Sequence, residues 1–328
     1  MKELLEVREL KTYFILDERR IVKAVDNVSI RLSQGESLGL AGESGCGKST
    51  LGYSILTCIP RPGKIVGGEI LFEGENVANK PESWLRRHYR WIKVSMVFQG
   101  AMNSLNPVLT VGRQLSEPLV YHKNMTYKEA RKYVVEALKL VGLPEHIVDR
   151  YPHELSGGMK QRAVIAMALI LKPKLVIADE PTTALDVVVQ AQIINLLKNL
   201  TQREGMGLIL ITHDLSVLSE VVDKVAIMYA GKIVEYGTSE QIYLTPKHPY
   251  TQKLLRAVPR LHVKVDKLEF IPGAPPNLIS PPPGCRFHPR CPIFKEKSNF
   301  KGLCDIEEPP LIEVEPEHKV ACWIYAKR

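Results

Sequence analysis

Long apolar segments are missing from this sequence of 328 residues. No stretch approaches the roughly 18–20 uninterrupted apolar residues that a membrane-spanning helix needs. Residues 1–7 contain no signal-peptide core and lead directly into an expected strand. We therefore expect an intracellular protein, whose attachment to a membrane runs through a partner.

The features of several other protein classes are also missing. The net charge is +8, but no basic block with interleaved aromatic residues indicates a nucleic-acid surface. There is no internal repeat and no heptad run, and no pair of cysteines has the C-x₂-C spacing of common zinc folds. The remaining composition, 45% apolar and 24% charged, is ordinary for a globular protein with room for a large and a small domain.

Residues 42–50 (Gly-Glu-Ser-Gly-Cys-Gly-Lys-Ser-Thr) fit the pattern G-x-x-x-x-G-K-[ST]. An apolar run, residues 37–41, precedes them and a potential helix, residues 51–57, follows, which is the context that a phosphate-binding loop requires. We call residues 42–50 the phosphate loop. Its glycines allow backbone N–H groups to approach a phosphate. We predict that Lys48 reaches the β- and γ-phosphates and that the Ser49 hydroxyl binds Mg²⁺. The predicted nucleotide contacts in the loop are Gly42, Ser44, Gly45, Cys46, Gly47, Lys48, Ser49 and Thr50.

Strand and helix patterns alternate along most of the chain, which predicts a mostly parallel, twisted sheet covered on both faces. We expect strands at residues 4–10, 27–32, 68–74, 93–99, 174–178, 208–212, 225–229 and 232–236. We expect helices at residues 126–141, 156–171 and 188–200. After residue 237 prolines become dense and the aliphatic periodicity fades. The prediction is a nucleotide-binding domain, residues 1–236 with a helical part at about 100–170, and a C-terminal extension, residues 237–328.

Further motifs make the resemblance specific. Residues 155–158 (Leu-Ser-Gly-Gly) precede the pair Asp179-Glu180, and Gln99, Asp186 and His213 occur in matching order. With the phosphate loop, these motifs closely resemble the ATP-binding cassette (ABC) family. The finer resemblance covers the whole chain and is to the ATPase subunits of dipeptide and oligopeptide importers; residues 104–107, 151–153, 178–186, 248–251 and the cysteine-bearing tail carry it.

The resemblance implies an α/β fold of the P-loop NTPase (RecA-like) type. It comprises an ABC nucleotide-binding domain with an antiparallel β subdomain, an inserted helical subdomain and a small cysteine-bearing C-terminal extension. Asp179 is expected to bind Mg²⁺, and Glu180 to act as the general base on the attacking water. Gln99 is expected to contact Mg²⁺ and the water, and His213 to hydrogen-bond the γ-phosphate.

The resemblance also implies a dimer. Ser156, Gly157 and Gly158 would cap the γ-phosphate of ATP held by the other subunit, since a helix N-terminus with small residues is an open anion site. Asp186 would lie at that interface. For the aromatic residue that stacks on adenine, Phe14 is favoured by its spacing and the adjacent Tyr13 is the alternative.

Four of the six cysteines lie in the last 44 residues: Cys285, Cys291, Cys304 and Cys322. In a reducing cytosol, clustered cysteines favour a metal site over disulfides. Some similar importer subunits hold a [4Fe–4S] cluster in such a tail, and four thiolates suit that cluster or tetrahedral Zn²⁺. The cluster is the preferred interpretation, with zinc, disulfides and free thiols as alternatives.

The predicted function is that of an ATP-hydrolysing, energy-coupling subunit of an ABC importer of dipeptides or oligopeptides. We expect it at the cytoplasmic face of the membrane, peripherally bound to two membrane-spanning permease subunits. The expected partners are a second ATPase subunit, homologous or identical, and indirectly an extracytoplasmic binding protein, but no nucleic acid. Oligosaccharide and nickel importers are alternatives. A soluble ABC ATPase outside transport is the alternative of another class, and the single cassette without heptads disfavours it.

Overall fold

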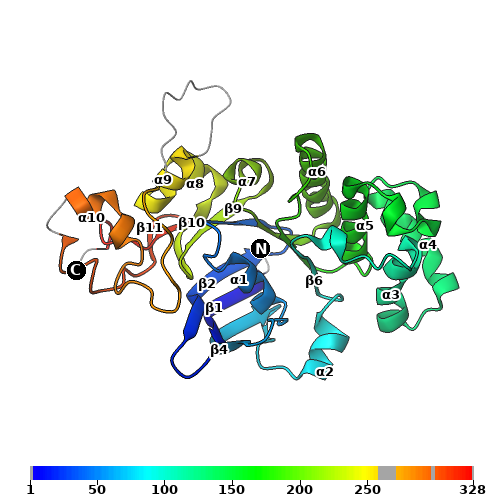
Figure 1. The fold of residues 1–328 in the computed structure, drawn as a ribbon, viewed down its shortest axis with the longest axis horizontal. Helices are drawn as coiled ribbons and strands as arrows, with labels where there is room; N and C mark the ends of the chain where they lie inside the picture. The colour runs from blue at the N-terminus through cyan, green and yellow to red at the C-terminus, as the bar shows by residue number, and fades with distance from the viewer. Residues whose placement is uncertain (1–2, 258–270, 297–299, 327–328) are drawn as a thin grey trace. The chain divides into compact units, whose positions relative to one another are not determined.

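The computed structural model describes residues 3–257, 271–296 and 300–326, which form two compact units (Figure 1). We call the first the helical unit; it contains Ser33–Glu36 and Asn79–Leu210. The second, which we call the loop unit, contains Glu3–Leu32, Ser37–Ala78 and the chain from Ile211 onward. Both units are discontinuous in sequence. The predicted domain boundary after residue 236 stays a prediction.

The loop unit contains an antiparallel four-stranded sheet in the order β2-β1-β4-β5. Its strands are β1 Glu3–Ile15, β2 Ile21–Ser33, β4 Gly63–Phe72 and β5 Glu75–Asn76. Buried aliphatic side chains alternate with exposed polar ones along β2 from Asn27 to Leu32, as a half-buried strand requires. Residues 11–14 lie within β1 rather than after it, because β1 continues its pairing with β4 as far as Phe14.

The loop unit also contributes five neighbouring strands in the order β11-β12-β10-β9-β3. They are β3 Ser37–Ala41, β9 Lys224–Tyr229, β10 Lys232–Thr238, β11 Ile312–Glu315 and β12 His318–Val320. β3 and β9 are parallel, whereas β9, β10, β12 and β11 pair antiparallel. The C-terminal hairpin β11–β12, which the sequence analysis did not predict, extends this sheet through β10. The helices of this unit are α1 Lys48–Ile55, α7 Leu215–Val221, α8 Ser239–Leu244, α9 Pro249–Arg256 and α10 Pro292–Glu296.

The helical unit combines three short strands with a group of helices (Figure 1). The strands are β6 Val94–Val97, β7 Leu175–Asp179 and β8 Gly207–Ile211, and β6 pairs parallel with β7. The helices are α2 Glu82–Trp84, α3 Val111–Lys123, α4 Tyr127–Leu140, α5 Gly157–Leu169 and α6 Val187–Glu204. Helices α3, α4 and α5 pack on one another.

Two helix termini show why the sequence folds as it does. The predicted capping box before α4 is confirmed: the Thr126 hydroxyl accepts the Glu129 N–H, and the Glu129 carboxylate accepts the Thr126 N–H. Helix α6 runs four residues beyond the predicted end at residue 200 and stops where Gly205 adopts φ 61°. Within the described ranges, no helix combines the length and apolarity that crossing a membrane requires.

Candidate nucleotide site and cysteine cluster

The phosphate loop connects β3 to α1 in the loop unit. All five residues of β3 are buried, and the loop follows immediately. Gly42 has φ 150° and Gly47 has φ 108°. A Cβ atom on Gly42 would lie 2.1 Å from the Met228 carbonyl oxygen, and one on Gly47 would lie 2.0 Å from the Ala24 carbonyl oxygen. Glycine is therefore required at both positions by conformation and by space.

Lys48 turns back over the phosphate loop. Its side-chain amine donates to the carbonyl oxygens of Gly42 at 2.8 Å and Glu43 at 3.1 Å, and the residue is only 6% exposed. Ser44 and Gly45 are exposed at the tip of the loop. The loop thus presents an ammonium group beside the N-terminus of α1, and the two together form an anion cradle.

Strand β1 approaches α1 on one side, where the Thr12 and Ser54 hydroxyls are 2.8 Å apart. Phe14 lies two residues further along β1 and so shares the face that meets α1. Tyr13 lies on the opposite face, where its hydroxyl donates to Asp26 at 2.6 Å. Burial and this bond raise the pKa of Tyr13 above its ordinary value. The hydroxyl of Tyr13 is thus engaged by Asp26. The preference for Phe14 over Tyr13 as the ring that stacks on adenine stays a prediction.

In the helical unit, the ends of β6 and β7 bring two predicted catalytic residues together. Asp179 ends β7 and is fully buried, and Glu180 follows with φ 45°. The Gln99 amide donates to the Glu180 carboxylate at 2.9 Å, and the Thr183 hydroxyl donates to the same oxygen at 3.1 Å. The side chain of Glu180 is therefore oriented by hydrogen bonds from two segments, although its role as a base stays a prediction.

The signature segment, residues 155–158, leads into helix α5. Ser156 caps this helix by accepting the Met159 N–H at 3.3 Å, and Ser156 and Gly157 are exposed. Asp186 caps α6 by accepting the Val189 N–H at 2.9 Å. Next to it, Val187 is 80% exposed at the first position of α6. Two exposed helix N-termini and an exposed apolar side chain thus lie on this unit.

His213 is exposed and belongs to the loop unit. It comes two residues after the end of β8. The predicted site residues are therefore divided between the two units. The loop unit holds Tyr13, Phe14, residues 42–50 and His213, and the helical unit holds Gln99, residues 156–158, Asp179, Glu180 and Asp186.

The four cysteines of the tail line one small cavity, together with His248 and Phe287. They are free thiols. Burial, reinforced by the neighbouring cysteines, raises the pKa of Cys285 and of Cys322 to about 12. The cavity measures about 20 Å³, room for about one water molecule. Across the parts of the chain that the structure describes, no group of three or more His, Cys, Asp or Glu side chains is arranged to hold a metal ion.

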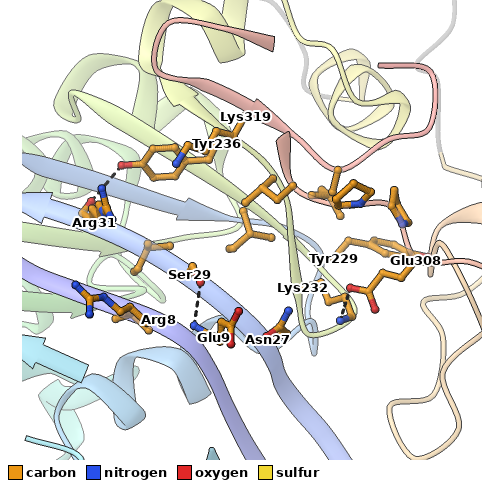
Figure 2. A pocket seen from close by; sticks show the side chains of 18 of the residues that line it. Arg8, Glu9, Asn27, Ser29, Arg31, Tyr229, Lys232, Tyr236, Glu308 and Lys319 are labelled. Carbon is orange, nitrogen blue, oxygen red and sulfur yellow. Dashed lines mark hydrogen bonds and ion pairs between the residues drawn. The ribbon is translucent and has the colours of Figure 1, made fainter. Parts of the chain in front are cut away.

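A second cavity, of about 910 Å³, separates the tail from the four-stranded sheet of the loop unit (Figure 2). Six basic and six acidic side chains line it, and several pair with one another. Figure 2 shows Lys232 directed at Glu308, 2.6 Å away, and Lys224 pairs with Glu317 at 2.9 Å. The phosphate loop does not contribute to this lining. The cavity is therefore lined by ion pairs and is separate from the phosphate loop.

A glycine loop with a buried lysine, an Asp-Glu pair at a strand end and a Ser-Gly-Gly helix start define a nucleotide-binding cassette, and comparisons agree. Residues 25–183 match the family described as "ABC transporter", and residues 234–297 match the "Oligopeptide/dipeptide transporter, C-terminal region". Among solved structures, the chain resembles the dimeric, post-hydrolysis ATP-binding cassette MJ0796 bound to ADP and Pi. The TM-score is 0.64 at 28% identity, covering 72% of this chain and 99% of that one.

Curated relatives match over nearly the whole length. The oligopeptide transport ATP-binding protein AppD of Bacillus subtilis (strain 168) is 46% identical, covering 99% of this chain and 98% of the relative. The dipeptide transport ATP-binding protein DppD of the same organism is 46% identical, covering 100% and 96%. The oligopeptide transport ATP-binding protein OppD of Escherichia coli (strain K12) is 45% identical, covering 98% and 93%. The chain belongs to this family of ABC transporter ATP-binding proteins.

Sequence reasoning missed the residues that hold the phosphate loop from outside. The Glu43 carboxylate binds Arg290, and the Glu43 N–H donates to the Tyr250 hydroxyl at 2.9 Å. Tyr250 belongs to a motif that carried the family resemblance, but nothing in its local pattern indicates contact with a loop 207 positions away.

Proposed function

We propose that this protein is the ATP-hydrolysing, energy-coupling subunit of an ABC importer of dipeptides or oligopeptides. The observation that carries the proposal is the whole-length match, tail included, to relatives named for oligopeptide and dipeptide transport. The complete set of nucleotide-binding and catalytic residue types in this chain supports hydrolysis rather than passive binding.

The phosphate loop is the part of the chain that binds ATP. The loop N–H groups and the N-terminus of α1 receive the phosphates, and Lys48 exchanges its bonds to the Gly42 and Glu43 carbonyl oxygens for bonds to phosphate oxygens. Stacking of adenine on Phe14 adds about 1 kcal/mol.

Two oxygen-bearing side chains suit Mg²⁺, which prefers hard oxygen ligands. Ser49 stands at the start of α1, and Asp179 ends β7 as a fully buried carboxylate. When bound, the ion neutralises charge on the phosphate oxygens. Glu180 acts beside Asp179 as the general base on the attacking water, oriented by the amide of Gln99. His213 contributes a hydrogen bond to the γ-phosphate.

Hydrolysis requires a second ATPase subunit. Ser156 and Gly157 are exposed at the N-terminus of α5, a helix of 13 residues, and this suits them to cap a phosphate from another chain. Asp186 and the exposed Val187 start α6 in the same unit and supply a surface for that partner. This subunit binds peripherally, at the cytoplasmic face of the membrane, to two membrane-spanning permeases that receive the resulting motion. An extracytoplasmic binding protein delivers the peptide.

The cysteine cluster is proposed to ligate a [4Fe–4S] cluster, with Zn²⁺ as the alternative. The residue types support the proposal, because four thiols line one cavity and a bound cationic centre would overcome their raised pKa values; in the described residues the thiols are not arranged as a metal site. Cys285, Cys291, Cys304 and Cys322 are the proposed ligands.

Peptide uptake tests the transport function. A strain lacking this subunit should take up labelled dipeptide or oligopeptide when it carries the wild-type gene, and should fail to do so with the Glu180→Gln variant produced at equal level. Uptake of peptide that is equally fast with Glu180→Gln, or in the absence of the subunit, would contradict the proposal. If the strain took up an oligosaccharide or nickel instead of peptide, the ATPase role would stand and the assigned substrate would change.

A further inference from the structure

Two buried arginines lie in residues 285–291, a segment that we call the cysteine turn because cysteines begin and end it. Arg286 and Arg290 are 8% and 7% exposed. The turn closes on itself, since the His288 N–H donates to the Cys285 carbonyl oxygen at 2.9 Å. A buried guanidinium group requires hydrogen-bond acceptors for its five donors. For both arginines, these acceptors include residues of the phosphate loop or of a turn that contacts it.

Arg290 forms a bidentate ion pair with Glu43 of the phosphate loop. Its Nη1 lies 2.6 Å from Glu43 Oε2, and its Nη2 lies 2.9 Å from Glu43 Oε1. The two side chains are 7% and 22% exposed. Two parallel, charge-assisted bonds fix orientation as well as distance, and shielding from water strengthens them. The pair thus holds the second residue of the loop at a defined position.

The remaining donors of Arg290 anchor it outside the loop. Its Nε donates to the Pro272 carbonyl oxygen at 2.9 Å, and its Nη2 donates to the Gly273 carbonyl oxygen at 3.1 Å. Its Nη1 also donates to the Tyr229 hydroxyl, at the end of β9, at 3.3 Å. Arg290 is therefore fixed to the tail and to the sheet, and Glu43 is its contact with the phosphate loop.

Glu43 connects this anchor to Lys48. Its carbonyl oxygen accepts a hydrogen bond from Lys48 Nζ at 3.1 Å, and its N–H donates to the Tyr250 hydroxyl at 2.9 Å. The side chain of Glu43 thus faces Arg290 while its main chain contacts Lys48. A change in the position of Glu43 therefore moves the site at which Lys48 rests.

Arg286 supports the middle of the loop through a second route. It donates to the Asp26 carboxylate and to the Ala230 carbonyl oxygen. In the same turn between β9 and β10, the Gly231 N–H donates to the Cys46 carbonyl oxygen at 2.8 Å. The cysteine turn therefore reaches the phosphate loop at Glu43 directly and at Cys46 through one intervening turn.

We propose that Arg290 is a positioning residue for ATP binding, which acts through Glu43 to hold the phosphate loop in the conformation that receives the phosphates. The tail is then part of the nucleotide site. This inference rests on the proposed ATPase function, because ATP is the ligand whose affinity it predicts.

A double-mutant cycle tests the route. The dissociation constant for ATP with Mg²⁺ is measured by equilibrium dialysis on the full chain, with the variants Arg290→Met, Glu43→Gln and the pair. We expect each single variant to weaken binding roughly tenfold and the double variant also roughly tenfold, because residues that act through one contact are not additive. If the double variant instead weakened ATP binding about a hundredfold, the product of the two single effects, Arg290 would act independently of Glu43 and the proposal would be overturned.

Matched variants control for charge and folding. Arg131→Met removes an exposed bidentate pair with Asp149, at 2.7 Å for both bonds, and should leave ATP affinity unchanged. Arg290→Lys should give intermediate affinity, since lysine lacks the planar fork; wild-type affinity would contradict the clamp. If Arg290→Met fails to fold, Glu43→Gln carries the test, because Arg290 keeps its bonds to residues 272 and 273.

The two hypotheses can fail separately. A wild-type chain that does not bind ATP, or that does not hydrolyse it in the presence of its partner ATP-binding subunit, would refute the proposed function. A wild-type chain that binds and hydrolyses ATP, with a Glu43→Gln variant of unchanged affinity, would refute only the role of Arg290.

Discussion

The phosphate loop and the signature segment are both proposed to bind nucleotide, but they are built differently. The loop is covered by its own chain. Lys48 is 6% exposed and donates hydrogen bonds to two carbonyl oxygens of the loop. The backbones of β2 and β9 pack against its glycines. Ser156 and Gly157 are exposed at the start of α5. In the proposed function the loop is therefore a complete phosphate-binding site, whereas the signature segment is a half-site for a ligand brought by another chain.

Loss of the general base should have the largest effect on turnover. Glu180→Gln keeps the shape of the side chain but removes its basicity, so hydrolysis should fall roughly 10²- to 10⁴-fold. ATP affinity should change little, since the loop is intact. Phosphate release measures the rate, with the exposed Glu204→Gln as the control. Turnover of Glu180→Gln at the wild-type rate would rule out its role.

Binding should depend most on the loop lysine. Lys48→Met removes a buried ammonium group, so the ATP dissociation constant should rise roughly a hundredfold. The exposed Lys128→Met should bind as the wild type does. Unchanged affinity in Lys48→Met would mean that the loop is not the phosphate site.

A substitution in the signature segment should reduce ATP hydrolysis without reducing ATP binding. Gly157 has room for a side chain, since an added Cβ would lie 3.6 Å from Leu185 Cδ2. Gly157→Asp places a negative charge where a partner's phosphate is expected, so hydrolysis should fall at least about tenfold. ATP affinity measured on the single chain should stay constant. A parallel loss of affinity would show that the segment serves the ATP of its own chain.

Adenine stacking should contribute less. Phe14→Ala should weaken ATP binding about fivefold, the equivalent of about 1 kcal/mol from one aromatic contact. Tyr13→Phe should bind as the wild type does, because only the hydroxyl bonded to Asp26 is removed. Loss of ATP affinity in Tyr13→Ala, together with wild-type affinity in Phe14→Ala, would assign the stacking ring to Tyr13.

Removal of one tail cysteine should have the smallest effect on ATP. Cys304→Ser should abolish the broad absorption near ~400 nm of a cluster in anaerobically purified protein, with iron and sulfide, while ATP affinity stays within about twofold. A zinc assay distinguishes the alternative metal. Absorption that Cys304→Ser leaves intact would remove this residue from the ligand set.

Features that depend on neighbouring residues could be predicted from the sequence. The phosphate loop between β3 and α1 and the capping box at Thr126 are encoded by short runs whose geometry follows from backbone rules. The strand that ends at Asp179 is recognisable because its residues form a short aliphatic run, and the structure buries all of them. Element bounds shifted by a few residues where pairing with a partner strand extended them, as in β1.

Features that depend on distant pairing could not be predicted. The hairpin β11–β12 is short and follows a proline-rich stretch, and only its pairing with β10 makes it a strand pair. The ion pair of Glu43 with Arg290 joins positions 247 apart, and no local pattern distinguishes this arginine from others. The division of the site residues between two units likewise follows from the packing of the whole chain.

The most direct test of the half-site account is sedimentation velocity of the Glu180→Gln chain with Mg²⁺, alone and with its partner ATP-binding subunit. Without nucleotide, we predict single chains. With ATP, we predict a two-chain species in at least one of the two samples, because the unhydrolysed γ-phosphate joins the phosphate loop of one chain to the signature segment of the other. Single chains in both samples, with ATP bound to each, would contradict the account.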